Sequence, residues 1–440
     1  MENSNSKINK IIDGLSMFAG KLSAQKHIMA IRDAFVITIP IIIVSAFFLL
    51  INNVLLQPET GLLRSIPNSA KLLEIGNQVY NGTLGVMAIL IAFSAGYSLA
   101  KAYGEDGILE AIISVCTYVI LIPPQLMVTS ITGESFEAGS VLTQAVTSSS
   151  GLFLALIASL TSVTLICKIN KYEKIKIKMP DSVPPAIAKS FNTLVPAFIV
   201  LTIFAIIEFL TVLVTGESIP DIIVKVLQTP LVGGFQTLPG ILLYVFLAGF
   251  VWVFGIHGAF VFGAISGPVL LTSLQQNIDA LKAGEVLPNI VTQPFLDAYV
   301  YMGGGGTMIC LVIAIFIASK RADYRMVTKL GLVPCLFNVS EPLMFGLPVI
   351  FNPILGIPLV IAPLVSTTIA YFATKFGLVS YTSIVMPWVT PPVLSGYLAT
   401  NGDIRASILQ IVIIAVGVLI YLPFVLASNK AAKLEKSNLA

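Results

Sequence analysis

Residues 237–273 read TLPGILLYVFLAGFVWVFGIHGAFVFGAISGPVLLTS, an apolar run that contains no charged residue and a single histidine, His257. The run is too long for one membrane crossing, which needs roughly 20 residues. Glycines at 255 and 258 let a helix break and let a backbone or a ligand approach closely. We therefore predict two segments separated at residues 255–258. A histidine at membrane depth is a functional candidate, and a structural, hydrogen-bonded histidine is the alternative.

The composition of the whole chain agrees with this local pattern. The chain has 440 residues, of which 56% are hydrophobic and 11% charged, and its mean hydropathy is +0.93. Soluble proteins carry about 25% charged residues. These values exclude an ordinary soluble enzyme, a disordered protein and a nucleic-acid-binding module. We predict an all-α polytopic membrane protein with about ten transmembrane helices.

Clusters of lysine and arginine predict the orientation of the chain in the membrane. Cytoplasmic segments carry an excess of these residues, and here they gather in residues 1–32, 168–178, 320–329 and 430–436. The stretch 129–150 contains none. Both termini are therefore predicted to be cytoplasmic.

Prolines interrupt two further apolar runs, residues 331–374 and 379–398. Proline removes a backbone donor, and irregular backbone at membrane depth is tolerated only inside protein or beside water. We predict a re-entrant hairpin at 331–350 and a second broken segment at 379–398, whose topology stays open like that of 237–273. Residues 6–26 and 217–229 are expected to form amphipathic helices at the membrane surface, with ordered loops as the alternative.

Polar residues concentrate beside these breaks. Asn338, Ser340 and Glu341 directly precede Pro342. A carboxylate in a broken helix can face a cavity and can bind a sugar hydroxyl or accept its proton. The alternative is a carboxylate that caps the end of a hairpin. Trp388 lies in the other broken segment, where its indole could cover a pyranose ring or anchor the chain at the membrane interface.

Glu208 is a second acid at membrane depth, in an apolar stretch without glycine or proline neighbours. It is either functional or a structural hydrogen-bonding residue between helices. The four cysteines lie in or beside apolar runs and lack the spacing of metal ligands. Neither a metal nor another cofactor is expected. The residues alone indicate a transporter for a polar solute.

Two of these motifs resemble a known family. GIHG at 255–258 and NVSEPLMFGLPVIFNP at 338–353 resemble signatures of enzyme IIC, the membrane component of the phosphoenolpyruvate-dependent sugar phosphotransferase system. MPDSVPPAIAKSFNTLVP at 179–196 and IRDAFVITIPIII at 31–43 resemble its lactose/cellobiose/N,N′-diacetylchitobiose branch. The resemblance covers essentially the whole chain.

The resemblance implies a homodimer in the bacterial cell membrane, with ten transmembrane helices and two re-entrant hairpins per chain. Residues 1–30 would form a cytoplasmic amphipathic segment and 31–230 the scaffold and dimerisation half. Residues 231–428 would form the sugar-binding transport half, which moves the sugar inward by an elevator-type motion. Residues 429–440 would be a cytoplasmic tail.

The resemblance also implies the chemistry. The C6 hydroxyl of a disaccharide, diacetylchitobiose or cellobiose, would be phosphorylated by a phosphocysteine on a IIB partner, itself charged by IIA. Glu341 matches the family carboxylate near that hydroxyl, a base, and His257 matches the histidine that orients the sugar. Asn338 would hydrogen-bond sugar hydroxyls, and Trp388 would contact the sugar.

The chain would thus be the membrane subunit of a phosphotransferase complex whose phosphoryl donor lies on another protein. No IIB-like segment is recognisable, so IIA and IIB are expected to be separate chains. The basic loops 168–189 and 320–330 are the candidate docking surfaces, and the alternative is that their charges only determine the membrane topology. A second functional class is also compatible with these residues. A proton-coupled secondary transporter would use His257 and Glu341 as a proton relay and leave the sugar unmodified.

Overall fold

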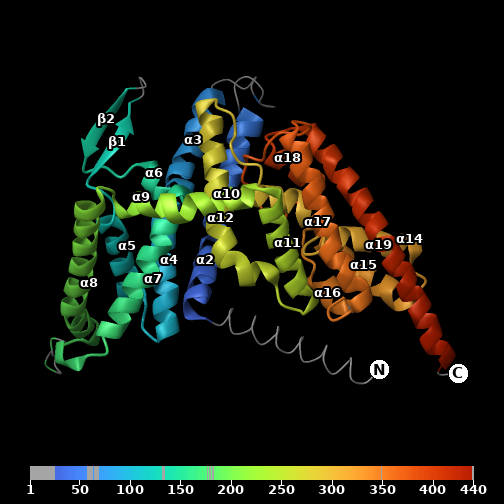
Figure 1. Ribbon diagram of the computed structural model, residues 1–440, viewed down its shortest axis with the longest axis horizontal. Helices are drawn as coiled ribbons and strands as arrows, with labels where there is room; N and C mark the ends of the chain where they lie inside the picture. Colours follow the sequence, from blue (N-terminus) through green and yellow to red (C-terminus); the bar gives the residue numbers. More distant parts are fainter. Residues whose placement is uncertain are drawn as a thin grey trace. The chain divides into compact units, whose positions relative to one another are not determined.

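The computed structural model describes residues 25–56, 63, 69–130, 134–175, 177, 180, 183–347 and 349–438. Helices account for most of these residues (Figure 1). The chain divides into two compact units. The N-terminal unit contains Ala24–Ile42 and Tyr80–Leu231, and the C-terminal unit contains Ile43–Val79 and Val232–Ala440. Nearly all of the predicted amphipathic segment 6–26 lies outside the described residues.

Three helices form the centre of the N-terminal unit. Helices α4, α5 and α7 pack closely because small residues line their contacts: a Cβ on Gly96 would lie 2.7 Å from the Cβ of Ser114. The Ser114 hydroxyl also donates to the carbonyl of Ala92 at 2.7 Å, as is common between membrane helices. The elements of this unit are α2 (Lys26–Leu50, which continues into the other unit), α4 (Met87–Tyr103), α5 (Ile108–Ile120), α6 (Gln144–Thr147), α7 (Leu152–Ile169), α8 (Pro185–Thr215) and α9 (Ile219–Ile223), with a π-helix at Val224–Gln228.

A small β-hairpin corrects the all-α prediction. Helix α5 ends at Ile120. Pro123 and Pro124 follow, and proline cannot continue a helix without losing a hydrogen bond. Strand β1 (Gln125–Thr129) then pairs antiparallel with β2 (Ser135–Gly139), and Val128 faces Phe136 in the register.

The C-terminal unit confirms the predicted breaks. The apolar run at 237–273 forms two helices, of which the first ends at Val253 and the second begins at Gly258, and 379–398 is irregular as far as Val393. The elements here are a π-helix at Ile51–Leu56, α3 (Ser69–Asn81, which ends in the other unit), α10 (Thr229–Gln236, which begins there), α11 (Leu238–Val253), α12 (Gly258–Ala283), α13 (Gln293–Phe295), a π-helix at Leu296–Val300, α14 (Met308–Ala318), α15 (Ala322–Leu336), α16 (Glu341–Gly346), α17 (Pro353–Lys375), α18 (Leu394–Ala399) and α19 (Ile404–Asn438).

Among the described residues, six helices are long and apolar enough to cross a membrane, or seven if a bent pair counts as one span. These six cover Lys26–Leu49, Lys71–Tyr103, Ser149–Ile169, Phe191–Thr215, Ile354–Lys375 and Ile404–Ala432. Many of their apolar side chains are exposed, such as Phe198 at 71% and Val214 at 81%. Such a surface is stable in lipid and not in water. The chain is therefore a multi-pass membrane protein.

Buried amides hold the irregular part of the C-terminal unit. The Asn277 side chain is fully buried and donates to the carbonyls of Asn289 at 2.7 Å and Thr382 at 2.9 Å. The hydroxyls of Thr292 and Thr382 lie 2.7 Å apart. Backbone groups that leave a helix inside a membrane protein need such partners. The side chains thus replace the missing helical bonds around 378–393.

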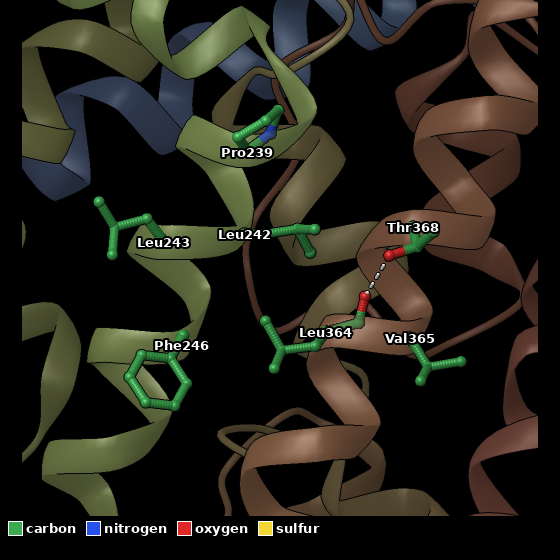
Figure 2. Close-up of a pocket in the computed structure, with 7 residues that line it drawn as sticks. All are labelled: Pro239, Leu242, Leu243, Phe246, Leu364, Val365 and Thr368. Carbon is green, nitrogen blue, oxygen red and sulfur yellow. Dashed lines mark hydrogen bonds between the residues drawn. The ribbon is translucent and has the colours of Figure 1, made fainter.

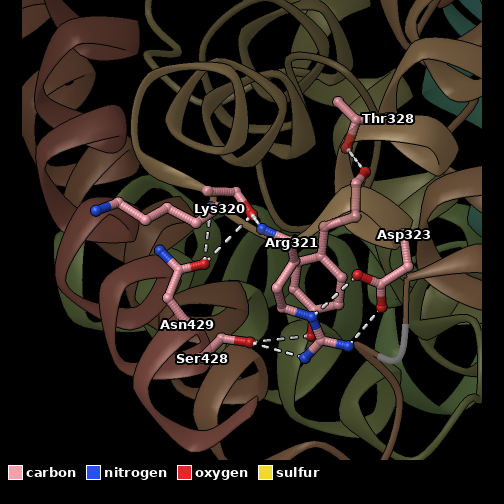
Figure 3. A network of polar contacts seen from close by, with 8 residues as sticks. Lys320, Arg321, Asp323, Thr328, Ser428 and Asn429 are labelled. Atoms are coloured by element: carbon pink, nitrogen blue, oxygen red, sulfur yellow. Dashed lines mark hydrogen bonds and ion pairs between the residues drawn. The ribbon is translucent and has the colours of Figure 1, made fainter. Parts of the chain in front are cut away.

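A polar network ties the turn between α14 and α15 to the last helix (Figure 3). The Asn429 amide oxygen accepts from the backbone N–H of Lys320 at 3.0 Å, and its nitrogen donates to the carbonyl of Ala318 at 2.8 Å. The Arg321 guanidinium donates to Ser428 at 3.3 Å and pairs with Asp323 at 2.6 Å. These contacts fix the start of α15, which leads to the residues discussed next.

Candidate functional site

His257 is displayed by the break between α11 and α12. Gly255 has φ of +78°, which a residue with a side chain rarely adopts, so the chain turns sharply after Trp252. His257 then caps α12 with an extended backbone. A Cβ on Gly258 would lie 2.3 Å from the carbonyl oxygen of Ala248, so only glycine allows this close return. The imidazole consequently packs on the Trp252 indole, with 4.6 Å between ring centroids.

The segment after α15 presents Glu341. Helix α15 ends at Leu336, and Asn338 adopts φ of +62°, a conformation that asparagine tolerates better than most residues. Ser340 is buried, whereas Glu341, the first residue of α16, is exposed. The glycine turn at 303–306 lies against Ser340, which precedes Glu341, and against Trp252, which packs on His257. The structure thus places the two ionisable side chains singled out in the sequence in one neighbourhood.

Asn338 joins three parts of the chain through its amide. Its oxygen accepts from the backbone N–H of Gly303 at 2.8 Å, and its nitrogen donates to the carbonyls of Trp388 at 2.6 Å and Thr390 at 3.0 Å. Both amide hydrogens are therefore used, and one acceptor lone pair remains for a further partner. The contact of Asn338 with a sugar hydroxyl stays a prediction, and what the structure adds is a positioning role.

The four-glycine turn at 303–306 fits between these segments. A Cβ on Gly304 would lie 2.5 Å from the Cβ of Ser340, and one on Gly305 would lie 2.8 Å from the indole nitrogen of Trp252. The turn therefore touches the glutamate segment on one side and the tryptophan–histidine pair on the other. No residue with a side chain could fill the same space without displacing one of them.

Trp388 and Glu208 are the two remaining candidate residues. Trp388 is 44% exposed, and the described contacts connect this residue to Asn338 through its backbone carbonyl. Its contact with a sugar stays a prediction. Glu208 lies in α8 of the N-terminal unit and accepts a hydrogen bond from the backbone N–H of Ile219 at 3.2 Å. This bond favours the structural alternative for Glu208.

Sequence reasoning missed one acid, Asp297. It lies in the π-helix Leu296–Val300, directly before the glycine turn, and accepts a hydrogen bond from the Gln293 amide at 2.8 Å. Short π-helical segments are rare and occur often at functional sites. The signal that could have identified it is a single acid within the apolar stretch FLDAYVYM, residues 295–302.

A cavity between α11 and α17 has a volume of about 400 Å³ (Figure 2). It offers no charged group, and its one hydroxyl, on Thr368, already donates to the carbonyl of Leu364 at 2.8 Å. A polar solute needs hydrogen-bonding partners when it leaves water. This cavity is therefore distinct from the site around His257 and Glu341. Its walls are Pro239, Leu242, Leu243, Phe246, Leu364, Val365 and Thr368.

Comparison with known proteins identifies the family of this chain. The sequence profile of the family described as "Phosphotransferase system, EIIC" matches residues 32–363. The chain is 34% identical to the lichenan permease IIC component of Bacillus subtilis (strain 168), over 98% of this chain and 96% of that protein. It is 32% identical to the cellobiose-specific EIIC component of Geobacillus stearothermophilus, over 95% and 93% of the two chains.

A solved structure supports the same family assignment. The crystal structure of the transporter ChbC, the IIC component from the N,N′-diacetylchitobiose-specific phosphotransferase system, superposes with a TM-score of 0.86 at 33% identity. The superposition covers 96% of this chain and 98% of ChbC. With this likeness in both sequence and fold, the chain belongs to the EIIC family, the sugar-specific membrane components of the phosphotransferase system.

Proposed function

We propose that this protein is the permease for a β-linked disaccharide, cellobiose or N,N′-diacetylchitobiose, and presents its C6 hydroxyl for phosphorylation by a IIB protein. The support comes from the sugars named for its relatives, which include cellobiose and, for the solved structure, diacetylchitobiose. The neighbourhood of His257 and Glu341 carries the proposal, because it combines a carboxylate, an imidazole and an indole at a break in apolar helices.

The residues divide the chemistry as follows. The C6 oxygen attacks the phosphorus of a phosphocysteine on IIB, so an O–P bond forms and the P–S bond breaks. The hydroxyl proton passes to the Glu341 carboxylate, which acts as general base. His257 holds the hydroxyl in line, Asn338 hydrogen-bonds sugar hydroxyls, and the exposed Trp388 covers the apolar side of the ring. Positioning supplies most of the remaining rate enhancement.

The transport part of the proposal concerns motion of the C-terminal unit. Residues 231–428 would carry the sugar in an elevator-type movement against a scaffold, residues 31–230, that also forms a homodimer. The boundary between the two compact units at Leu231 and Val232 supports the division at residue 231, whereas Ile43–Val79, which the sequence assigns to the scaffold, belongs to the C-terminal unit. We further propose ten crossings, re-entrant hairpins at 331–350 and 379–398, and cytoplasmic termini. The helix ends at Leu336 and Gly346 support the first hairpin.

IIA and IIB are proposed to be separate chains. The lactose-specific EIICB component of Lacticaseibacillus casei aligns with this chain over only 70% of its own length, which agrees with a further B part in that protein. Docking is proposed at 320–330, where Lys320, Arg325 and Lys329 are exposed. The Asn429 bonds to Lys320 and Ala318 hold this surface in place.

Uptake into membrane vesicles tests the function. Labelled cellobiose or diacetylchitobiose is supplied outside, with or without phosphorylated IIB inside, and the internal product is identified. We expect a disaccharide 6-phosphate that appears only with IIB. Unmodified sugar that accumulates without IIB, accompanied by proton uptake, would refute phosphorylation and favour the secondary transporter.

Glu341→Gln tests the base. The variant should retain sugar binding, because the amide keeps the shape, and lose phosphorylation, because it cannot take the proton. Glu208→Gln is the matched control, an acid at membrane depth that is bonded to backbone, and it should phosphorylate normally. Wild-type phosphorylation by Glu341→Gln would remove Glu341 from this role.

A further inference from the structure

Loops of the C-terminal unit surround a second cavity, with a volume of about 520 Å³. Residues within 281–287, 380–383 and 400–403 line it, and we call it the loop pocket. These segments are the end of α12 with the turn that follows, the irregular stretch before α18, and the turn between α18 and α19. The volume lies within the roughly 300–1,000 Å³ of pockets that bind small molecules. The loop pocket is therefore large enough for one sugar ring.

Three polar side chains that line the loop pocket make no hydrogen bond within the described part of the chain, those of Tyr381, Ser383 and Asn401. Ser383 is only 2% exposed. A hydroxyl that has left water without gaining a partner is unfavourable by itself. Because Ser383 lines the cavity, a hydroxyl-bearing molecule in the cavity supplies the missing bond. The lining thus suits a ligand with several hydroxyl groups.

The loop pocket offers a ligand no net charge. Among the described residues that line it, Asp403 is the one charged group. Its carboxylate accepts from the backbone N–H of Ser380 at 2.8 Å and pairs with the Arg405 guanidinium at 2.9 Å. An ion would find no unpaired opposite charge here, so the pocket fits an uncharged ligand.

The rest of the wall adds an apolar surface to these hydrogen-bonding groups. Its apolar side chains are those of Leu281, Val286 and Leu287. Small-molecule sites combine such apolar walls with a few placed polar groups. A sugar ring matches both parts, because it has hydroxyl groups at its edge and C–H groups on its face.

The loop pocket lies at the opposite end of α19 from the surface proposed to dock IIB. Helix α19 begins at Ile404, directly after Asp403, and runs to the C-terminal end of the chain (Figure 1). Asn429, which holds the surface at 320–330, follows Ile404 by 25 residues, or about 38 Å along a helix. This length exceeds the hydrocarbon core of a bilayer, roughly 30 Å. With the cytoplasmic tail proposed above, the loop pocket faces the outside.

The loop pocket is also separate from the site around His257. His257 caps the start of α12, and Leu281 lies near the end of the same helix. The two are 24 residues apart, which corresponds to at most about 36 Å along a helix. The lining of the loop pocket includes neither His257 nor Glu341 among its described residues. A ligand in the loop pocket therefore occupies a place of its own.

We propose that the loop pocket binds one ring of the sugar on the outer side of the membrane, before the sugar reaches His257 and Glu341. The hydroxyls of Tyr381 and Ser383 and the amide of Asn401 donate to the ring hydroxyls and accept from them. The loop pocket is then the first contact of the substrate with the transport half. The identity of the ligand and the outward direction rest on the proposed function.

Protection of an introduced cysteine tests the inference in the full-length protein. Val286 lines the pocket and is 88% exposed, so Val286→Cys leaves the fold intact and makes the pocket open to alkylation. Cys116→Ser removes the exposed native cysteine. Right-side-out membrane vesicles are treated with a membrane-impermeant maleimide, with and without cellobiose or diacetylchitobiose. Vesicles replace maltoside detergents, which themselves carry a disaccharide. We expect the maleimide to react and the disaccharide to slow the reaction.

Two substitutions remove the hydrogen-bonding groups one at a time. Ser383→Ala and Asn401→Gly should each raise the disaccharide concentration for half-protection about fivefold, as expected for one neutral hydrogen bond. Glycine suits position 401 because Asn401 has φ of +57°. Tyr381→Phe provides a third variant if one of these does not fold. Ser366→Ala, at another serine that is 2% exposed, is the matched control and should leave protection unchanged.

The outcomes separate this inference from the function. Absence of protection, or protection unchanged in Ser383→Ala and Asn401→Gly, overturns the sugar site in the loop pocket. Protection that Glu341→Ala abolishes also overturns it, because the cysteine would then report on sugar bound at the other site. Alkylation from the inner side alone overturns the outward direction. The 6-phosphate product of the uptake assay is measured independently, so a failure of the proposed function is detected there.

Discussion

Gly304→Ala is a sharp test of the site because it changes one methyl group at its centre. Gly304 has φ of +96°, and a Cβ there would lie 2.5 Å from the Cβ of Ser340 and 2.8 Å from the carbonyl oxygen of Asn338. The methyl group can fit only if the glycine turn and the segment leading to Glu341 move apart.

Two effects add in this variant. An alanine in the left-handed region costs about 1–2 kcal/mol, and overpacking costs about 1–3 kcal/mol. The free energy of unfolding should therefore fall by about 2–5 kcal/mol. Catalysis should fall as well, because a misplacement of about 1 Å in a site can lower the rate by about a hundredfold.

Two other glycines separate these effects. Gly377 has φ of +71° but no atom within 4 Å of its Cβ position, so Gly377→Ala carries the conformational cost alone. Gly263 lies in α12 with open space around it, so Gly263→Ala should be neutral or slightly stabilising. Thermal unfolding in detergent and the rate of sugar phosphorylation are measured for all three variants.

The expected order is a large loss of stability and activity for Gly304→Ala, a small loss of stability only for Gly377→Ala, and none for Gly263→Ala. If Gly304→Ala phosphorylates sugar at the wild-type rate, the contact between the turn and Ser340 does not position Glu341. If Gly304→Ala and Gly377→Ala lose the same stability, the loss comes from backbone strain and not from the close contact.

Two more predictions follow from the same contacts. His257→Ala should weaken sugar binding about tenfold, as for the loss of one hydrogen bond, and titration calorimetry with the transported disaccharide measures it; unchanged affinity would contradict the orienting role. Asp403 lies in the turn before α19. Burial raises the pKa of its carboxyl group, but hydrogen bonds from Arg405 and Ser380 lower this pKa by a larger amount, so that it lies at about 2. Because the pKa is lowered in the folded state, Asp403 stabilises the fold above about pH 4 by about 2 kcal/mol and loses this effect as the pH falls toward 2. The melting temperature of Asp403→Asn should thus be lower than that of wild type at pH 7, and the difference should be smaller at pH 3. An equal difference in melting temperature at the two pH values would argue against the carboxylate as the cause.

The sequence predicted the parts of the fold that depend on local chemistry. Glycine located the break at 255–258, and proline located the interruptions of the apolar runs 331–374 and 379–398. The β-hairpin at 125–139 was missed because its strands follow an apolar run and their pairing is a tertiary contact. The number of crossings was not predictable from hydropathy alone, since broken and short helices carry the same apolar signal as spans.

The candidate site was predictable in its residue types and not in its connections. His257 and Glu341 stood out because ionisable groups are rare in apolar segments. The amide bonds of Asn338 to Gly303 and Trp388 join residues far apart in the sequence, and no spacing rule reveals them. Asp297 was overlooked although it is the single acid in the apolar stretch 295–302, and its position in a π-helix becomes visible only in three dimensions.

The three bonds of Asn338 have a consequence for the biogenesis of the protein. They reach back 35 residues to Gly303 and forward 52 residues to Thr390. When synthesis has reached residue 341, Gly303 is already part of the chain, but the acceptors at Trp388 and Thr390 are not. Chains that end between residues 342 and 388 should thus keep the bond from Gly303 to the Asn338 amide oxygen and leave the Asn338 amide nitrogen without its two carbonyl acceptors.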